Sequence, residues 1–130
     1  MTPLLTLIVY AVGLAFVAIL LAAVLRNREW TAEGMRVGLS NRDDLPEATP
    51  LGGRAVRAAN NTIEALILFT PLALVAHAAG LDSEALFGAQ LFLGARVVYL
   101  PIYLAGITVV RSLVWGVGVL GLILMAIPLL

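Results

Sequence analysis

The chain has 130 residues, 62% of them hydrophobic and 12% charged, whereas about a quarter of the residues in a soluble domain are charged. It contains no cysteine, which excludes a disulfide framework and a protein thiolate as nucleophile, and its zero net charge without any basic run argues against a nucleic-acid partner. The composition indicates an all-α integral membrane protein, a single domain with room for about four spans of roughly 20 residues.

The first expected span covers residues 3–25 and carries no charge. Small residues let membrane helices approach closely, so a face of alanines is predicted to pack against another span. Intervals of three and four residues define that face: Ala11, Ala15, Ala18 and Ala22. Residues 26–53 follow as a polar segment with several glycines and prolines, and we predict that they form a long cytoplasmic loop.

The second expected span, residues 54–79, begins with a stripe of polar side chains. Their spacing places four of them on one helix face: Arg54, Arg57, Asn61 and Glu64. Charged and amide groups are expensive inside a bilayer, so the default interpretation of this stripe is a functional site. Arg54, at the edge of the span, is also explained as an interfacial anchor.

A second polar stripe lies on the third expected span, residues 83–105. Its members share one helix face: Arg96, Tyr99 and Tyr103. Tyrosines near the end of a span are also common interfacial anchors. At a rise of ~1.5 Å per residue, Glu64 and Arg96 lie about 15 and 20 Å from opposite ends of their spans. We therefore predict a buried ion pair between them, bridged by Asn61, which could serve only to fix helix register.

The fourth expected span, residues 112–130, is preceded by Arg111 and begins with Ser112. Four spans put both termini on one side of the membrane and the arginine-bearing connections on the other, which the positive-inside tendency makes cytoplasmic. An arginine at a span boundary is commonly no more than such a topology signal. Several polar side chains, however, are left over after one ion pair is formed, and they lie toward the cytoplasmic end of the spans. They predict a site for an anionic polar ligand, with apolar walls beyond it.

These residues resemble the MAPEG family, the membrane-associated proteins in eicosanoid and glutathione metabolism, in its bacterial-type members. The resemblance extends over nearly the whole chain. It rests on R-A-x-x-N-x-x-E at the start of the second span, on an arginine followed by tyrosines in the third, and on Arg-Ser before the fourth. The first of these motifs is fairly specific, whereas the other two gain weight from their order.

The resemblance implies a homotrimer of four-helix bundles, with glutathione as cosubstrate bound between neighbouring subunits near the cytoplasmic face. The residues that it implies as glutathione contacts are Arg57, Asn61, Glu64, Arg96, Tyr99 and Tyr103, with Arg26 matched by position alone. Arg111 corresponds to an arginine proposed to stabilise the glutathione thiolate, and Ser112 to its neighbour. No metal site is implied. The chain departs from the family at Asn60, where some glutathione-using members have another arginine.

The leading functional hypothesis is a membrane-bound glutathione transferase or peroxidase that acts on lipophilic electrophiles or hydroperoxides arriving from the membrane lipids. We expect it in the bacterial inner membrane, with its site facing the cytoplasm. The alternative is a non-catalytic lipid-binding or scaffold protein of the same fold, which the departure at Asn60 favours. A transporter or channel is disfavoured because the outer half of the spans offers few polar groups: Thr70, His77 and Gln90.

Overall fold

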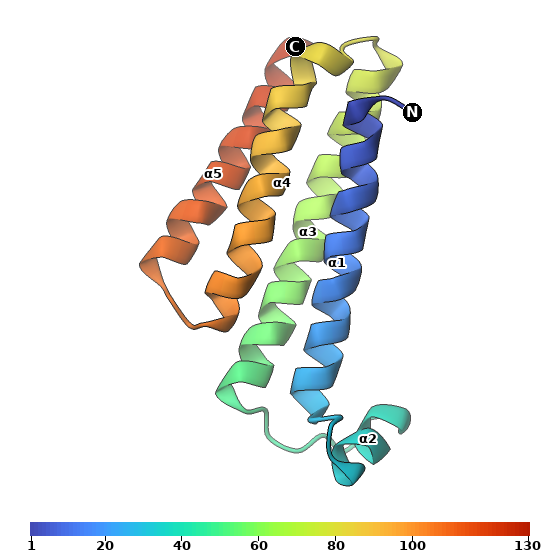
Figure 1. The fold of residues 1–130 in the computed structure, drawn as a ribbon, viewed down its shortest axis with the longest axis vertical. Coiled ribbons are helices and arrows are strands. Elements are labelled where there is room, and N and C mark those ends of the chain that lie inside the picture. The colour runs from blue at the N-terminus through green and yellow to red at the C-terminus, as the bar shows by residue number, and fades with distance from the viewer.

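A computed structural model describes all residues, 1–130, and it is entirely helical. The helices are α1 (Pro3–Asn27), α2 (Ala32–Leu39), α3 (Pro50–Ala78), α4 (Asp82–Leu104) and α5 (Val109–Ala126), followed by the short 3₁₀ helix η1 (Ile127–Leu129). Four of them are long and apolar enough to cross a membrane. They run side by side, with both termini at one end and α2 at the other (Figure 1). The predicted all-α membrane four-helix bundle is confirmed.

Helix α1 packs through its alanines. Thr2 caps its N-terminus by accepting a hydrogen bond from the Leu5 amide, and Pro3 occupies the first turn, where its missing N–H is tolerated. All four alanines of the predicted face are buried. Helix α1 lies beside α3 (Figure 1), and Ala18 and Ala22 are buried in one cluster with alanines of α3, which confirms that this stripe mediates close helix packing.

The segment 26–53 is not a loop throughout, because it contains α2. Thr31 caps this helix by accepting a hydrogen bond from the Gly34 amide at 3.0 Å. Gly34 is buried against the end of α1, where a Cβ would overlap the carbonyl oxygen of Arg28, and a Cβ on Gly38 would crowd the Glu29 side chain. The glycines of this segment, which suggested a loop, therefore allow α2 to pack closely against the end of α1.

Helix α3 also begins earlier than the sequence suggested, at Pro50 rather than at residue 54. Thr49 accepts a hydrogen bond from the Gly52 amide at 3.0 Å, and Pro50 follows at the favoured first position, so the start signal lies inside the glycine-containing segment. Arg54 is consequently within the helix, where its Nε donates to the Leu104 carbonyl oxygen at 3.0 Å. This bond joins the start of α3 to the end of α4.

Helices α4 and α5 approach each other closely at two glycines. A Cβ on Gly88 would stand 2.6 Å from the Gly121 carbonyl oxygen, and one on Gly121 would stand 2.7 Å from the Gly88 oxygen. At this crossing, Phe92 of α4 stacks on Phe69 of α3, with ring centroids 4.5 Å apart. Helix α5 packs mainly against α4 and much less against α3, which leaves space between α3 and α5.

Candidate functional site

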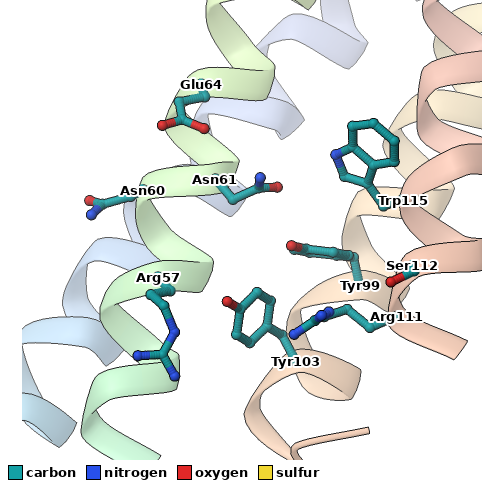
Figure 2. A pocket seen from close by; sticks show the side chains of 9 residues that line it. All are labelled: Arg57, Asn60, Asn61, Glu64, Tyr99, Tyr103, Arg111, Ser112 and Trp115. Atoms are coloured by element: carbon teal, nitrogen blue, oxygen red, sulfur yellow. The ribbon is translucent and has the colours of Figure 1, made fainter. Parts of the chain in front are cut away.

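A polar cavity of about 410 Å³ lies between α3, α4 and α5, toward the end of the bundle where α4 turns into α5. Figure 2 shows the α3 side chains on one side of it and the α4 and α5 side chains on the other. Its lining residues are Arg57, Asn60, Asn61, Glu64, Tyr99, Tyr103, Arg111, Ser112 and Trp115. The tertiary structure thus joins most of the two predicted polar stripes and the Arg-Ser pair in one site.

The α3 wall follows from helical spacing. Arg57, Asn61 and Glu64 succeed one another at intervals of four and three residues, so their side chains share one face. Arg57 and Glu64 are exposed, and neither makes a hydrogen bond or an ion pair within the chain. The Oδ1 of Asn61 is buried without a hydrogen-bond partner. Asn60 points to the other side of α3 (Figure 2).

The opposite wall consists of stacked aromatic and cationic groups. Tyr99 and Tyr103 meet edge to face, with ring centroids 5.5 Å apart. The guanidinium carbon of Arg111 lies 4.8 Å from the centre of the Tyr103 ring, a cation–π contact that holds the cation over the cavity without neutralising it. The Ser112 hydroxyl donates to the Thr108 carbonyl oxygen of its own helix at 3.3 Å.

The predicted ion pair between Glu64 and Arg96 is wrong. The one contact between oppositely chargeable side chains joins His77 Nδ1 to Asp82 Oδ1 at 3.0 Å, at the other end of α3, and it is an ion pair only when His77 is protonated. Arg96 instead donates from Nη2 to the Thr62 hydroxyl at 3.2 Å. Thr62 and Glu64 are about 200° apart around the helix, so Glu64 does not share the side of α3 on which Thr62 contacts Arg96, although Glu64 and Arg96 line one cavity.

Arg96 does not line the polar cavity but a second, mostly apolar one of about 170 Å³, which we call the slot. It is formed by Asn61, Glu64, Ala65 and Leu68 of α3, Phe92 and Arg96 of α4, and Trp115, Gly118, Val119 and Leu122 of α5. The polar cavity and the slot share Asn61, Glu64 and Trp115. The two cavities therefore adjoin, one of them polar and the other mostly apolar.

Sequence reasoning missed Trp115, which lines both cavities, and Thr62, which lines neither but accepts the hydrogen bond of Arg96. Trp115 lies four residues after Arg111, a spacing that places both on one face of α5 and could have identified it. Thr62 had no such signal, because a threonine in a membrane helix commonly bonds its own backbone, and Thr62 does donate to the Ala58 carbonyl oxygen at 2.8 Å.

Arg26 lies outside the site in a single chain. It stands at the end of α1, where its Nη2 donates to the Pro46 carbonyl oxygen at 2.7 Å, and its buried Nη1 has no partner. It lines two other hollows, one against α2 and one between α1 and α3. The other predicted ligand contacts therefore come from α3, α4 and α5, whereas Arg26 belongs to α1, which lies on the far side of α3 from α5 (Figure 1).

The four spanning helices define a multi-pass integral membrane protein with a polar cavity between α3, α4 and α5. The sequence model of the MAPEG family matches residues 4–130, nearly the whole length, and the chain belongs to the MAPEG family. This match confirms the resemblance drawn from the three motifs. No curated protein and no solved structure matched the chain.

Proposed function

We propose that the protein is a membrane-bound glutathione transferase or peroxidase, in which glutathione thiolate reacts with lipophilic electrophiles or hydroperoxides. One observation carries the proposal: Arg57, Glu64 and Arg111 line the same cavity and none of them has an ion-pair partner in the chain. Charged groups left unpaired within a membrane bundle point to a functional site, and a ligand of complementary charge would pair them. The lipophilic substrate would come from the membrane lipids.

The polar cavity fits the functional groups of glutathione. Glutathione carries two carboxylates, an ammonium group, two amides and a thiol. Arg57 and Arg111 can each take an anionic group, Glu64 can take the ammonium group, and the orphaned Oδ1 of Asn61 can accept from an amide N–H. A volume of about 410 Å³ is within the range of small-molecule sites.

Arg111 is the group that we assign to the thiol. A thiolate is the reactive nucleophile, and a neighbouring guanidinium lowers the pKa of a thiol and holds its anion. Arg111 is available for this role because its guanidinium rests on the face of Tyr103 and makes no ion pair. Ser112 follows Arg111 on the same turn, lining the cavity at its rim. Tyr99 and Tyr103 supply hydroxyl donors beside it.

The assembly is proposed on the same basis as the ligand. MAPEG membership favours a homotrimer with glutathione between subunits, and Arg26 would then contribute to the site of a neighbouring copy. Its buried, unpartnered Nη1 supports such an external partner. We place the site at the cytoplasmic face of a bacterial inner membrane, because α2 and the arginine-bearing connections lie at the site's end of the bundle.

Loss of glutathione binding in two single variants tests the ligand assignment. We expect Arg57→Ala and Glu64→Ala each to weaken glutathione binding about tenfold or more, since each removes a charge-assisted hydrogen bond. Calorimetric titration of the purified protein in detergent measures the effect. Arg36→Ala is the matched control, because Arg36 is an exposed arginine of α2 outside the cavity. Unchanged affinity in both site variants contradicts the assignment.

The second candidate is a non-catalytic lipid-binding or scaffold protein of the same fold. It is favoured by Asn60, which stands where some glutathione-using members have an arginine and which turns away from Asn61 (Figure 2). This candidate predicts binding of an apolar ligand in the slot without turnover across a panel of electrophiles and hydroperoxides. Turnover of any of them in the presence of glutathione excludes it.

A further inference from the structure

Helix α2 has an apolar side that no other part of the chain covers. Its rotation is fixed by Gly34 and Gly38, which turn toward the end of α1, because a Cβ on either would overlap or crowd atoms of residues 27–29. Met35 and Leu39 each follow one of these glycines, so both side chains are turned about 100° away from that contact. They are 44% and 82% exposed. Close packing on one side of α2 therefore leaves two large apolar groups free on another.

This side of α2 lies at the depth of the lipid headgroups. Helix α1 has 25 residues, so at ~1.5 Å per residue it is about 37 Å long, somewhat more than a hydrocarbon core of ~30 Å. Helix α2 packs mainly against α1 and projects sideways from its end, on the side away from α3 (Figure 1). Trp30, between α1 and α2, is 62% exposed. Tryptophan is enriched at the membrane–water interface, which agrees with this depth.

The exposed apolar surface of the span continues into this segment. Phe16, Leu20 and Val24 are exposed at intervals of four residues and form a stripe along α1 that reaches its last turns. Exposed apolar side chains on a membrane span are the surface that it offers to lipid. Because Trp30 follows soon after this stripe and leads into α2, the surface that requires an apolar partner does not end with α1.

We propose that α2 is an interfacial helix that rests on the phospholipid surface, with Trp30, Met35 and Leu39 inserted at the boundary between headgroups and acyl chains. Arg36 is exposed and lies about 60° around the helix from Leu39, at the border of the apolar side, where its guanidinium can bond a lipid phosphate. None of these residues lines the polar cavity or the slot. The inference therefore goes beyond the proposed function and does not depend on it.

Apolar insertion, and not net charge, holds α2 on the bilayer in this proposal. Residues 26–53 contain four arginines and five acidic residues, so an anionic membrane surface does not attract the segment as a whole. A phosphate that Arg36 can bond is present in every phospholipid. We therefore expect α2 to insert equally into phosphatidylcholine alone and into phosphatidylcholine mixed with phosphatidylglycerol.

Lipid contact also accounts for the formation of so short a helix. Helix α2 has 8 residues, fewer than the ~12–15 that an isolated helix needs in water. Its contact with α1 is made largely by two glycines, which have no side chains to bury. Burial of Met35 and Leu39 in lipid supplies the apolar area that this contact lacks.

Fluorescent labels on α2 test the proposal directly, because the chain has no cysteine and each single-cysteine variant is labelled at one position only. The labelled full-length protein is reconstituted in vesicles of phosphatidylcholine that is brominated in its acyl chains. We expect bimane on Met35→Cys and on Leu39→Cys to be quenched by the brominated chains and shielded from iodide in the water. Glu33→Cys is the matched control, since Glu33 is exposed on the same helix about 200° from Met35, and its label should show the opposite pattern.

Three results of this experiment overturn the proposal. If iodide quenches the label at Leu39 as strongly as the label at Glu33, the apolar side faces water. If the label is shielded from iodide but is not quenched by brominated lipid, protein covers α2, as in an association with a second copy. If quenching by lipid appears only after phosphatidylglycerol is added, charge and not apolar insertion holds the helix.

Hydrogen exchange in lipid nanodiscs tests the energetic part without a label. The double variant Met35→Gln, Leu39→Gln removes the apolar groups and keeps the helix propensity, because methionine, leucine and glutamine have similar values. We expect the amides of α2 to exchange about tenfold faster and those of α1 and α3 to be unchanged. Glu33→Gln, the matched control, should leave all of them unchanged. Equal exchange of α2 in the double variant and the unmodified protein overturns the proposal.

Discussion

Replacing Arg111 with leucine is expected to abolish the ultraviolet absorbance of glutathione thiolate that appears when glutathione binds. Arg111 is the cation of the α5 wall of the polar cavity, with no carboxylate to neutralise it. Without it, the bound thiol returns toward its ordinary pKa of about 8.5 and is mostly protonated at neutral pH. Turnover with either class of electrophile should fall about a hundredfold or more.

Difference absorbance on addition of glutathione measures the thiolate directly, and steady-state kinetics measure the turnover. Arg111→Lys is the informative companion, since it keeps a positive charge near the cavity and should retain part of the absorbance change. The assignment of Arg111 is refuted if the leucine variant still binds glutathione and shows the full thiolate signal. Lost binding with an intact fold would instead assign Arg111 to a carboxylate.

The second large effect concerns the fold. Gly88→Ala and Gly121→Ala are each expected to destabilise the bundle, because the new methyl group would meet backbone atoms, which cannot move aside as a flexible side chain can. At Gly88 it would lie 2.6 Å from the Gly121 carbonyl oxygen, and at Gly121 it would lie 2.7 Å from the Phe92 amide nitrogen. Overpacking of this kind costs about 1–3 kcal/mol of unfolding free energy, and helix separation should bring it to the upper end.

Unfolding of the detergent-solubilised protein by added sodium dodecyl sulfate, followed by circular dichroism, measures this loss. Gly94→Ala in α4 and Gly116→Ala in α5 are matched controls, since a Cβ at either position has nothing within 4 Å. The controls should keep their stability or gain slightly from the higher helix propensity of alanine. If all four variants unfold alike, the crossing at Gly88 and Gly121 does not hold α4 to α5.

The crossing links stability to the site. Gly118 and Gly121 bring α5 close to α4 on one face, whereas α5 makes few contacts with α3. The same geometry that presses α5 against α4 therefore opens the space in which the slot lies. Loss of the glycine crossing should alter both the slot and the position of Arg111 at the start of α5.

The sequence by itself determined the elements of this protein that depend on local chemistry. Hydropathy and length specify four spans, and helical spacing places Arg57, Asn61 and Glu64 on one face, because both follow from composition and from the period of the helix. The motifs also sufficed to recognise the family. The sequence predicted the first residue of α3 less well, since its start signal, Thr49 and Pro50, lies next to glycines that are typical of a loop.

Only the tertiary structure decided which side chains meet across helices. Depth along the spans suggested that Glu64 would reach Arg96, but depth does not determine the rotation of α3, which packing sets by turning Thr62 toward α4. The same packing joins Trp115 to the site and separates Arg26 from it in a single chain. The depth of a residue along its helix follows from the sequence of that helix alone. The direction in which its side chain faces depends on the close contacts between helices.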